Sequence, residues 1–520
     1  MLAGHHRRDG SISTTEAATS DDSAPPSAPP SFFHFHESKA SIPRRIIRFI
    51  NTQWLKFSDW LIDWTPVCLV VSYWVVCTAI FVMCSSLAIE VFYYFYMIAN
   101  LYIAMTAAIE SFLGLTPVRD AAKAADKVDA TGKFPSEDSK LPILDMVMVA
   151  YLPNEKDIVV GQIMYALEEL DYPKDKFRIN LVYNTPRPIE PVETELRQLA
   201  DRYPQLNVIK VPNSTSKADN LNHFFSLKAT GADYTGIFDT DHFPHPHNPR
   251  WAAERFIKDQ PDIVQGRCVV YNTNESFMAK MIAIEFDKIY AIAHPGRQRL
   301  AKFGLFCGSN GWWRSDLIRN LKMRGEMLTE DIDSALRAYG SGARAIHDMN
   351  VLSYEMAPNS FKSFWKQRMR WTQGWTQASI HHMPLVWTNP PNGTRRCKQE
   401  RLALFSLLFT RELSYYLVSQ HTCLLISFII NDWPNSPGTL AKLIFFRYPV
   451  AEWFLFTTIA ALFATIYFTE RVRSEFTTFR SMIVFSIIYI PYLILQSTMG
   501  LFGHARQIVA YSAWNPTART

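Results

Sequence analysis

Apolar and polar positions divide the chain into long uncharged runs near both ends and a polar block between them. Residues 66–89 and 91–109 contain no charged side chain. Because about 20 apolar residues cross a bilayer core, these two runs predict a helical hairpin in a membrane. Three later runs, at 413–430, 453–469 and 481–503, predict further crossings. The pattern therefore excludes both a single soluble globule and a wholly membrane-embedded protein.

The polar block alternates apolar runs of strand length with segments of helical period. The strand-like runs cover residues 144–152, 177–183, 207–211, 234–238 and 263–271. Such alternation predicts an α/β domain with a mainly parallel sheet and helices on both faces. Ligands of such sheets bind beyond the carboxyl ends of the strands, so we expect the functional residues there.

These patterns predict a domain organisation with seven parts. In chain order they are a disordered tail at 1–40, an interfacial amphipathic segment at 41–64, two membrane helices at 65–115, the α/β domain at 140–358, interfacial helices at 359–412, about three membrane helices at 413–503 and a tail at 504–520. The first tail is rich in Ser, Thr and Pro and cannot bury enough apolar surface to become ordered.

Charged residues at the ends of the apolar runs predict the orientation in the membrane. Arg48 precedes the first hairpin and Arg119 follows it, so the positive-inside rule places both flanks and the α/β domain in the cytosol. Arg411 and Glu412 lie just before the third apolar run. They fit either the joint between an interfacial helix and a spanning helix or the polar lining of a pore.

Overall composition changes this picture little. The chain has 53 Lys and Arg against 48 Asp and Glu, a net charge of +5. Basic residues of the polar block are not interleaved with stacking aromatics, so we expect no nucleic-acid partner. The seven cysteines include no Cys-x-x-Cys pair, which fits a reduced protein without a disulfide framework or a zinc knuckle.

An acidic pair follows the fourth predicted strand directly. Asp239 and Asp241 are one residue apart, and two such carboxylates can share a hard divalent cation that also bridges phosphate oxygens. Without context, an Asp-x-Asp pair is a solvated acidic turn about as often as it is a ligand site. The preceding strand favours a ligand site, because it places the pair at the carboxyl end of the sheet.

A second acidic group, Thr329-Glu330-Asp331, opens a predicted helix that runs to Tyr339. One interpretation is helix capping by Thr329, with the acidic residues complementing the helix dipole. A carboxylate at the edge of a cleft is also the usual general base for a sugar hydroxyl. The two interpretations are compatible.

The segment from Gln367 to Trp371 adds a cation and an aromatic ring. On a helix, Gln367, Arg370 and Trp371 share one face. Arg370 can then meet a diphosphate, while the Trp371 indole offers a flat apolar surface to a sugar ring. The alternative is an amphipathic helix on the membrane. We expect both, with the polar face of an interfacial helix turned toward the active site.

Five motifs stand in the order found in a known family. They are Lys217-Ala218-Asp219-Asn220-Leu221-Asn222, Asp239-x-Asp241-His242, Phe306-Cys307-Gly308-Ser309-Asn310, Thr329-Glu330-Asp331 and Gln367-x-x-Arg370-Trp371. Between membrane helices, this set resembles the processive family 2 glycosyltransferases, which include cellulose, hyaluronan and chitin synthases. The nearest likeness is to fungal membrane type 2 glycosyltransferases related to capsule and hyaluronan synthases.

This resemblance implies a GT-A-like fold and a role for each motif. The implied catalytic residues are Asp331, as the base, and Glu330; the implied ligands of Mg²⁺ or Mn²⁺ are Asp239 and Asp241; the implied nucleotide contacts are Lys217, Arg370, Gln367, Asn184 and Asp239; and the implied acceptor contacts are Trp371, Cys307, Gly308, Ser309 and His242. The family usually has a uridine-binding aspartate where this chain has Asn184. A neutral amide still hydrogen-bonds, but it cannot supply the charge-assisted bond of a carboxylate.

The resemblance also implies a reaction and a location. It implies a plasma-membrane enzyme that transfers sugar from a UDP-sugar, with inversion, to a growing β-linked polysaccharide such as those of cell walls, and moves the polymer across the bilayer. A non-processive enzyme that makes a glycolipid, like a ceramide glucosyltransferase, is one alternative. A nucleotide-binding pseudoenzyme or scaffold, which Asn184 allows, is another. A polymer needs a polar path through the bilayer, so the membrane helices distinguish the first two.

Overall fold

The computed structural model describes residues 42–509. The predicted tail at 1–40 and residues 510–520 therefore lie outside the described residues. Contacts divide the chain into two compact units, Met1–Leu61 and Ile62–Thr520. We describe each unit by itself.

The described part of the first unit is the opening half of helix α1 (Ile42–Met83). Its aromatic side chains follow one another along the helix. The Phe57 ring lies 5.9 Å from the Trp54 ring and 5.9 Å from the Trp60 ring, and all three side chains are exposed. A ridge of exposed aromatic rings of this kind suits the headgroup region of a membrane.

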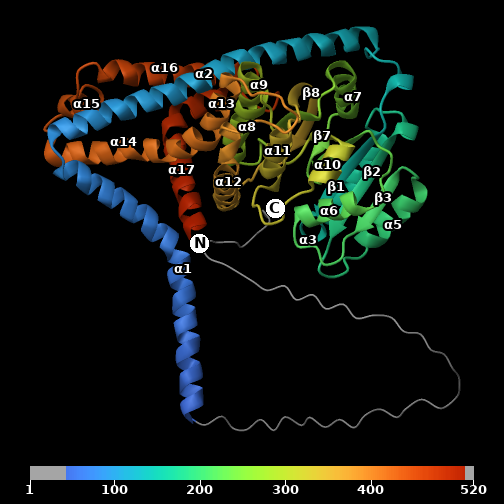
Figure 1. Ribbon diagram of the computed structural model, residues 1–520, viewed down its shortest axis with the longest axis horizontal. Coiled ribbons are helices and arrows are strands. Elements are labelled where there is room, and N and C mark those ends of the chain that lie inside the picture. Colours follow the sequence, from blue (N-terminus) through green and yellow to red (C-terminus); the bar gives the residue numbers. More distant parts are fainter. Residues whose placement is uncertain (1–41, 510–520) are drawn as a thin grey trace. The chain divides into compact units, whose positions relative to one another are not determined.

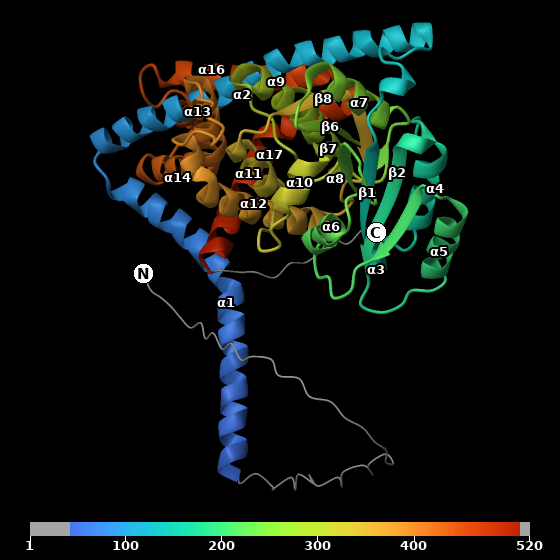
Figure 2. The same cartoon turned by 45° about the vertical axis from the view of Figure 1, so that its right-hand side comes forward.

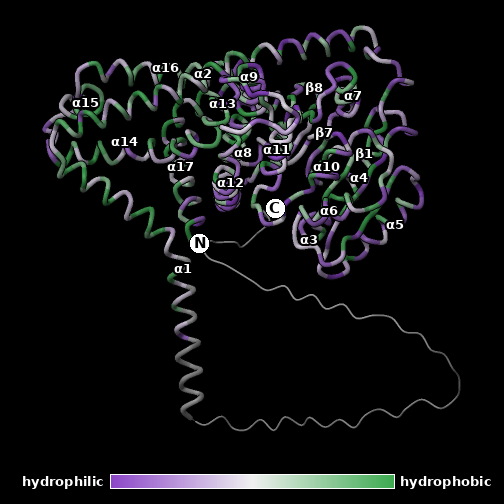
Figure 3. Tube along the Cα trace, viewed as in Figure 1, coloured by the Kyte–Doolittle hydropathy of each residue, from purple (hydrophilic) through white to green (hydrophobic). Residues whose placement is uncertain are grey.

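Five helical stretches of the described residues are long and apolar enough to cross a membrane, in agreement with the sequence pattern. They belong to α1, α2 (Ser86–Thr131), α14 (Arg411–Asn431), α16 (Ala451–Glu470) and α17 (Phe479–Ile508). Figure 1 shows α14 and α16 beside α2, and Figure 3 shows that hydrophobic residues predominate where these helices lie side by side. The predicted combination of an α/β domain with membrane-length helices is confirmed.

The first hairpin differs from the pattern in where it turns. The chain turns at Cys84 and Ser85, and the Ser85 hydroxyl accepts a hydrogen bond from the Ala88 amide to cap α2. Glu90 therefore lies inside α2 and not at the turn. Helix α2 then continues to Thr131, well beyond its apolar part, because its distal half packs against α9 (His294–Ala301) and β8 (Ala345–Glu355) of the α/β domain.

Helix α17 has the composition of a crossing but packs along the α/β domain. Its side chains Phe485, Tyr492 and Met499 are buried in one cluster with residues of α8 (Phe277–Phe286) and α12 (Phe361–His382). Near its end, Gly503 approaches α12 so closely that a Cβ atom there would lie 2.4 Å from Thr372 Oγ1. The helix thus stays in contact with this domain over most of its length.

The α/β domain contains one eight-stranded sheet. Its strands are β1 (Leu144–Tyr151), β2 (Phe177–Asn184), β3 (Leu206–Lys210), β4 (Tyr234–Asp239), β5 (Phe243–Pro244), β6 (Ile263–Val270), β7 (Gly311–Arg314) and β8 (Ala345–Glu355). They lie in the order β3-β2-β1-β4-β7-β6-β8-β5. The first four are parallel, while β7 is antiparallel to both β4 and β6. The sheet is therefore GT-A-like and mainly parallel, as predicted.

Helices cover both faces of this sheet. The remaining helices are α3 (Leu152–Glu155), α4 (Val159–Glu168), α5 (Val192–Arg202), α6 (Lys217–Ser226), α7 (Asn248–Asp259), α10 (Ser315–Leu321), α11 (Glu330–Ser341), α13 (Lys398–Phe405) and α15 (Pro437–Phe445), with π-helical turns at Asp287–Ala293 and Ser406–Thr410. Figure 2 shows α4 and α5 outside β1, β2 and β3.

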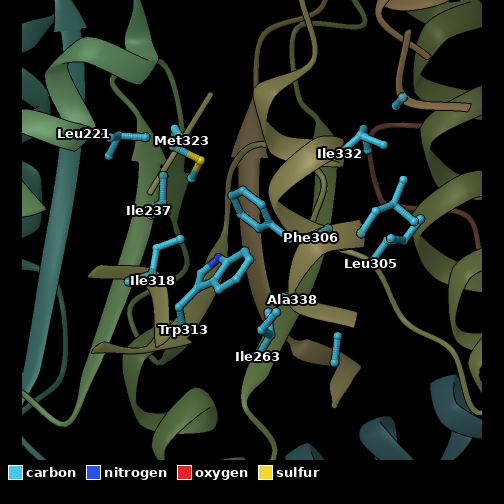
Figure 4. Packing of buried hydrophobic residues seen from close by; sticks show 14 of the residues in the cluster. Leu221, Ile237, Ile263, Leu305, Phe306, Trp313, Ile318, Met323, Ile332 and Ala338 are labelled. Atoms are coloured by element: carbon cyan, nitrogen blue, oxygen red, sulfur yellow. The ribbon is translucent and has the colours of Figure 1, made fainter. Parts of the chain in front are cut away.

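Alternate residues of β1 enter two different cores. Met146 and Met148 pack with α4, α5 and α7, while Val147 and Val149 pack with α6, α10 and α11. The second core also includes Trp313 of β7, whose ring lies near Phe306 in Figure 4. Because a parallel strand buried on both faces needs mainly apolar residues, β1 is hydrophobic apart from Asp145, which pairs with Arg178 of β2 at 2.7 Å.

Candidate active site

The register of the sheet brings predicted site residues to one edge. Asn184 pairs with Tyr151 at the ends of β2 and β1, and Asp239 at the end of β4 pairs with Val149. The Asn184 amide donates to the carbonyl of Ser214 at 3.0 Å, and its Oδ1 accepts from Asn220 at 2.9 Å. The carboxyl edge of the sheet therefore holds Asn184 and Asp239, as expected for a ligand site.

Lys217 connects this edge to the segment around Gly308. It begins α6, which Ser216 caps. Its Nζ atom lies 2.5 Å from Asp239 Oδ1 and donates to the Gly308 carbonyl at 2.7 Å. Burial would lower the pKa of Lys217, but the charges of Asp239 and Glu330 outweigh it and raise that pKa. The amine is therefore a fixed positive charge in the site.

The acidic pair has the chemistry of a site for Mg²⁺ or Mn²⁺. Ligand atoms of Asp239, Asp241 and His242 lie within 4.8 Å of one another. The carboxylates are hard oxygen donors that suit either cation. His242 Nε2 instead lies 2.9 Å from Glu355 Oε2, and its Nδ1 lies 3.5 Å from Ser353 Oγ. The two carboxylates fit a divalent cation, whereas His242 is held by β8.

The segment from Cys307 to Ser309 is fastened to the same edge. The Asp239 amide donates to Ser309 Oγ at 3.1 Å, and the Cys307 amide donates to Gln265 Oε1 at 2.8 Å. Burial raises the pKa of the Cys307 thiol, so the thiol stays protonated and cannot act as a nucleophile. Cys307, Gly308 and Ser309 thus form a backbone wall beside Asp239.

Gly308 brings this wall against the carboxylates of α11. It adopts a φ of +89°, and a Cβ atom there would lie 2.8 Å from Asp331 Oδ2. Burial, followed by the charge of Asp331, raises the pKa of Glu330 to about 7, although Lys217 and Arg370 act in the opposite direction. Burial also raises the pKa of Asp331. The pair therefore has the raised proton affinity that suits a general base near neutral pH.

Thr329 does not cap α11 in the predicted way. It lies at the N-cap position, but its side chain makes no capping hydrogen bond. The reason is packing: a Cβ atom on Gly374 of α12 would lie 2.5 Å from Thr329 Cγ2. In addition, the Leu328 amide donates to Gln377 Oε1 of α12 at 3.0 Å. Helix α12 thus holds the residues that precede Glu330.

Helix α12 also places Arg370 close to this pair. The Arg370 charge lowers the proton affinity of both Glu330 and Asp331. Its Nε atom and the Gln367 Oε1 atom are buried and have no hydrogen-bond partner among the described residues. Buried polar groups without partners are uncommon and point to a ligand. An anionic ligand such as a diphosphate suits Arg370.

Sequence reasoning overlooked Arg368 and Glu285. Arg368 lies within the motif but faces away from Gln367 and Arg370, and its Nη2 atom donates to Glu285 Oε2 at 2.7 Å. The Arg368 guanidinium carbon is 4.5 Å from the centre of the half-buried Trp371 ring. The only signal in the sequence was an additional basic residue inside the motif, with no indication of its partner.

Arg411 and Glu412 lie where α14 begins, directly after the π-helical turn Ser406–Thr410. The Arg411 guanidinium carbon lies 4.1 Å from the centre of the Trp375 ring of α12. Glu412 Oε2 lies 2.6 Å from His504 Nε2 of α17. This pair therefore stands at a contact between α12, α14 and α17, and its two interpretations stay predictions.

Comparisons with known proteins relate the chain to glycosyltransferases. The model of the glycosyl transferase family group 2 matches residues 237–494. "Probable glycosyltransferase YdaM" of Bacillus subtilis is 24% identical over 340 residues, which cover 64% of this chain and 77% of that protein. A cellulose synthase catalytic subunit (UDP-forming) of Pseudomonas fluorescens is 24% identical over 270 residues, covering 50% of this chain and 35% of the relative.

A plant relative and a solved structure extend the comparison. "Probable glucomannan 4-beta-mannosyltransferase 7" of Oryza sativa is 25% identical over 262 residues, covering 48% of this chain and 42% of the relative. The mannosyltransferase PcManGT of Pyrobaculum calidifontis, solved with GDP-Man and Mn²⁺, has a TM-score of 0.44 and 16% identity, covering 71% of this chain and 99% of that one. The chain thus spans less than half of the cellulose synthase and glucomannan relatives.

Proposed function

Because this chain is a glycosyltransferase with a family 2 domain, we propose that it is an inverting, processive polysaccharide synthase of the plasma membrane. It uses a UDP-sugar in the cytosol, extends a β-linked polymer and moves that polymer across the bilayer. The observation that carries the proposal is the contact chain from Asp239 through Lys217 and Gly308 to Asp331. These contacts support the assignment of the donor, acceptor and base motifs to one site. The closer likeness to fungal capsule and hyaluronan synthases stays a prediction from the motifs.

In the proposed reaction, Lys217 and Arg370 bind the donor diphosphate, with Gln367 beside it. Asp239 and Asp241 would hold Mg²⁺ or Mn²⁺, which when bound offsets negative charge on the leaving diphosphate. Cationic side chains placed in advance need no reorganisation as that charge develops. The bond between the anomeric carbon and the phosphate oxygen breaks on the face opposite to the incoming acceptor oxygen.

Asp331 is the proposed base that takes the proton from the acceptor hydroxyl. Burial raises the pKa of Asp331, and the backbone of Gly308 limits where the acceptor can lie. We propose that Trp371 stacks on the terminal sugar, with Cys307, Ser309 and His242 near the acceptor. An aromatic ring provides such a sugar with a flat apolar surface.

The nucleobase of the donor is the part of the substrate that the site residues define least. Asn184 is held between Asn220 and Ser214, where the family usually has an aspartate. The names of the relatives include both a UDP-forming enzyme and a structure with GDP-Man. A test of the donor should therefore include both UDP-sugars and GDP-sugars, although the motifs favour UDP.

Polar side chains extend from α12 into the apolar helices, and they support a polysaccharide product rather than a glycolipid product. Thr376 donates to Glu412, and His504 joins Glu412 to Tyr416. Further along, Tyr73 of α1 lies 3.2 Å from Ser419 of α14. A saccharide chain needs polar groups along its path through a bilayer, whereas transfer to a lipid does not. The acidic motifs keep all their carboxylates, and this counts against a pseudoenzyme.

The test is nucleotide release by the detergent-purified protein with Mg²⁺ or Mn²⁺ and a panel of UDP- and GDP-sugars, followed by sizing of the product. Asp331→Asn is the control. A long, glycosidase-sensitive product from one UDP-sugar is expected. A short lipid-linked product would favour the glycolipid enzyme, and nucleotide binding without turnover would favour the pseudoenzyme.

A further inference from the structure

A buried ion pair lies directly behind the proposed acceptor platform. Arg368 Nη2 of α12 and Glu285 Oε2 of α8 are 2.7 Å apart, and their side chains are only 9% and 6% exposed. A buried ion pair often adds little stability compared with apolar residues of the same size. We therefore look for a function of the pair at this place, in addition to any effect on stability.

Glu285 is also bound by α17. The Tyr492 hydroxyl donates to Glu285 Oε2 at 2.6 Å, and the Gln496 amide donates to Glu285 Oε1 at 3.0 Å. Burial alone would raise the pKa of Glu285, but the Arg368 charge and these hydrogen bonds outweigh it, and the pKa is lowered. One ionised carboxylate therefore joins α8, α12 and α17.

Arg368 in turn lies between two aromatic rings of its own helix. Its guanidinium carbon is 4.5 Å from the centre of the Trp371 ring and 5.2 Å from that of Phe364. A planar guanidinium stacks on aromatic faces in a way that an ammonium group does not. The orientation of the Trp371 indole therefore depends on where Glu285 holds Arg368.

The backbone of α12 is fixed independently of this pair. Gly374 packs against Thr329, and Gly503 of α17 packs against Thr372. These contacts come from one turn of α12, directly after Trp371, and need no contribution from the Arg368 side chain. A change at Arg368 should consequently move the Trp371 ring more than the helix itself.

We propose that Glu285 and Arg368 are positioning residues that set the Trp371 ring for the terminal acceptor sugar, and that α17 takes part through Tyr492. The inference rests on the proposed function, because it takes Trp371 as the acceptor contact. Lys217, the proposed donor contact, is not part of the group formed by Glu285, Arg368 and Trp371. Donor binding should therefore not depend on that group.

The central variant is Arg368→Lys, which keeps the charge beside Glu285 but loses the planar group that lies on Trp371. The matched control is Arg297→Lys. Arg297 makes a comparable pair with Glu110, joining α9 to α2, and no aromatic ring lies over its guanidinium among the described residues. Kinetics use oligosaccharides cut from the wild-type product as acceptors, and nucleotide affinity is measured separately with UDP and Mn²⁺.

We expect Arg368→Lys to raise the acceptor KM about tenfold, with kcat and the Kd for UDP changed less than about twofold. Arg297→Lys should leave the acceptor KM unchanged. Tyr492→Phe, which removes one bond to Glu285, should shift the acceptor KM in the same direction by a smaller factor. An unchanged acceptor KM in Arg368→Lys, or equal losses in acceptor and donor parameters, would overturn the positioning role.

A second measurement separates this inference from the proposed function. If the wild type makes no saccharide product, the proposed function fails, and thermal unfolding of Arg368→Lys, Trp371→Ala and the double variant still tests the contact. Melting-temperature shifts that do not add would support coupling between the two side chains. Additive shifts would show that Arg368 does not hold the ring, and the inference would fall.

Discussion

The Nζ atom of Lys217 lies 2.5 Å from Oδ1 of Asp239, so the first residue of α6 is paired with the last residue of β4. The pair is only partly buried, and the acidic residues around it raise the pKa of the lysine. Without a donor, Asp239 neutralises this cation. When a donor and a metal ion bind, we expect the diphosphate to neutralise Lys217 in place of Asp239, whose carboxylate would then bind the metal ion.

This arrangement predicts that Lys217→Met lowers kcat/KM for the donor by about 10²–10³-fold, the usual cost of losing one preorganised group that meets transition-state charge. Initial rates of nucleotide release against donor concentration measure the effect. Lys217→Arg should recover part of the loss. The exposed Lys228 provides the control variant Lys228→Met, which should behave as the wild type. A loss of similar size in both methionine variants would contradict the assignment.

Asp331→Asn should retain the fold and nucleotide binding but lower turnover at least about a hundredfold, since a general base contributes about 10²–10⁴ to a rate. The change is assayed as steady-state nucleotide release, with UDP affinity measured separately. Glu326→Gln is a matched control, because Glu326 is an exposed carboxylate a few residues earlier in the chain. Turnover close to wild type in Asp331→Asn would move the base to another residue.

Much of the fold and site could be predicted from the sequence. The five predicted strands lie within two residues of β1, β2, β3, β4 and β6, because apolar side chains predominate in the strands of a sheet covered on both faces. By contrast, β7 and β8 were not predicted. Only four residues form β7, and β8 carries polar side chains such as His347 and Asp348, so neither shows a clear strand pattern.

The limits of sequence reasoning at the site have a similar cause. Motifs reveal residues that lie close together in the chain, which is why Asp239 and Arg370 could be singled out. The partner of Arg368 is 83 residues away, and no spacing rule links Arg368 to Glu285. The packing of α17 on α8 and α12 was equally hidden, because an apolar helix has the same composition whether it meets lipid or protein.

The raised pKa values of the acidic pair predict the acid limb of the pH profile. Burial and the neighbouring Asp331 raise the pKa of Glu330 to about 7, so below that pH one carboxylate of the pair keeps its proton. The base Asp331 must be ionised to act, and burial raises its pKa, so as the pH is lowered kcat/KM should fall at a higher pH than an ordinary aspartate would give. Glu330→Gln removes a neighbouring negative charge and should move this limb to lower pH. An unchanged limb would mean that another group controls it.

Gly308 offers a test of the contact between the two walls of the site. In Gly308→Ala, the Cβ atom would meet Asp331 Oδ2 at 2.8 Å, so we expect displacement of the base and a fall in kcat of at least about tenfold. Gly231→Ala is the matched control, because its φ is also positive at +77° but nothing lies within 4 Å of the added atom. Both variants carry a backbone strain of about 1–3 kcal/mol. If Gly308→Ala were as active as Gly231→Ala, the contact with Asp331 would not control the position of the base.

The packing of α17 predicts the side of the membrane on which the chain ends. Before the helix, Thr477 and Ser474 donate to Asp287 of the α/β domain; near its end, Gly503 packs on α12. Contact with the α/β domain before the helix and with α12 near its end predicts that α17 does not cross the bilayer. Four crossings, by α1, α2, α14 and α16, would then return the chain to the side of the catalytic domain. An epitope tag after Thr520 should therefore show the same protease accessibility in sealed vesicles as a tag in the exposed segment 391–395. A tag in the segment 432–436, between α14 and α15, should behave in the opposite way. If the C-terminal tag instead followed the 432–436 tag, α17 would be a true fifth crossing.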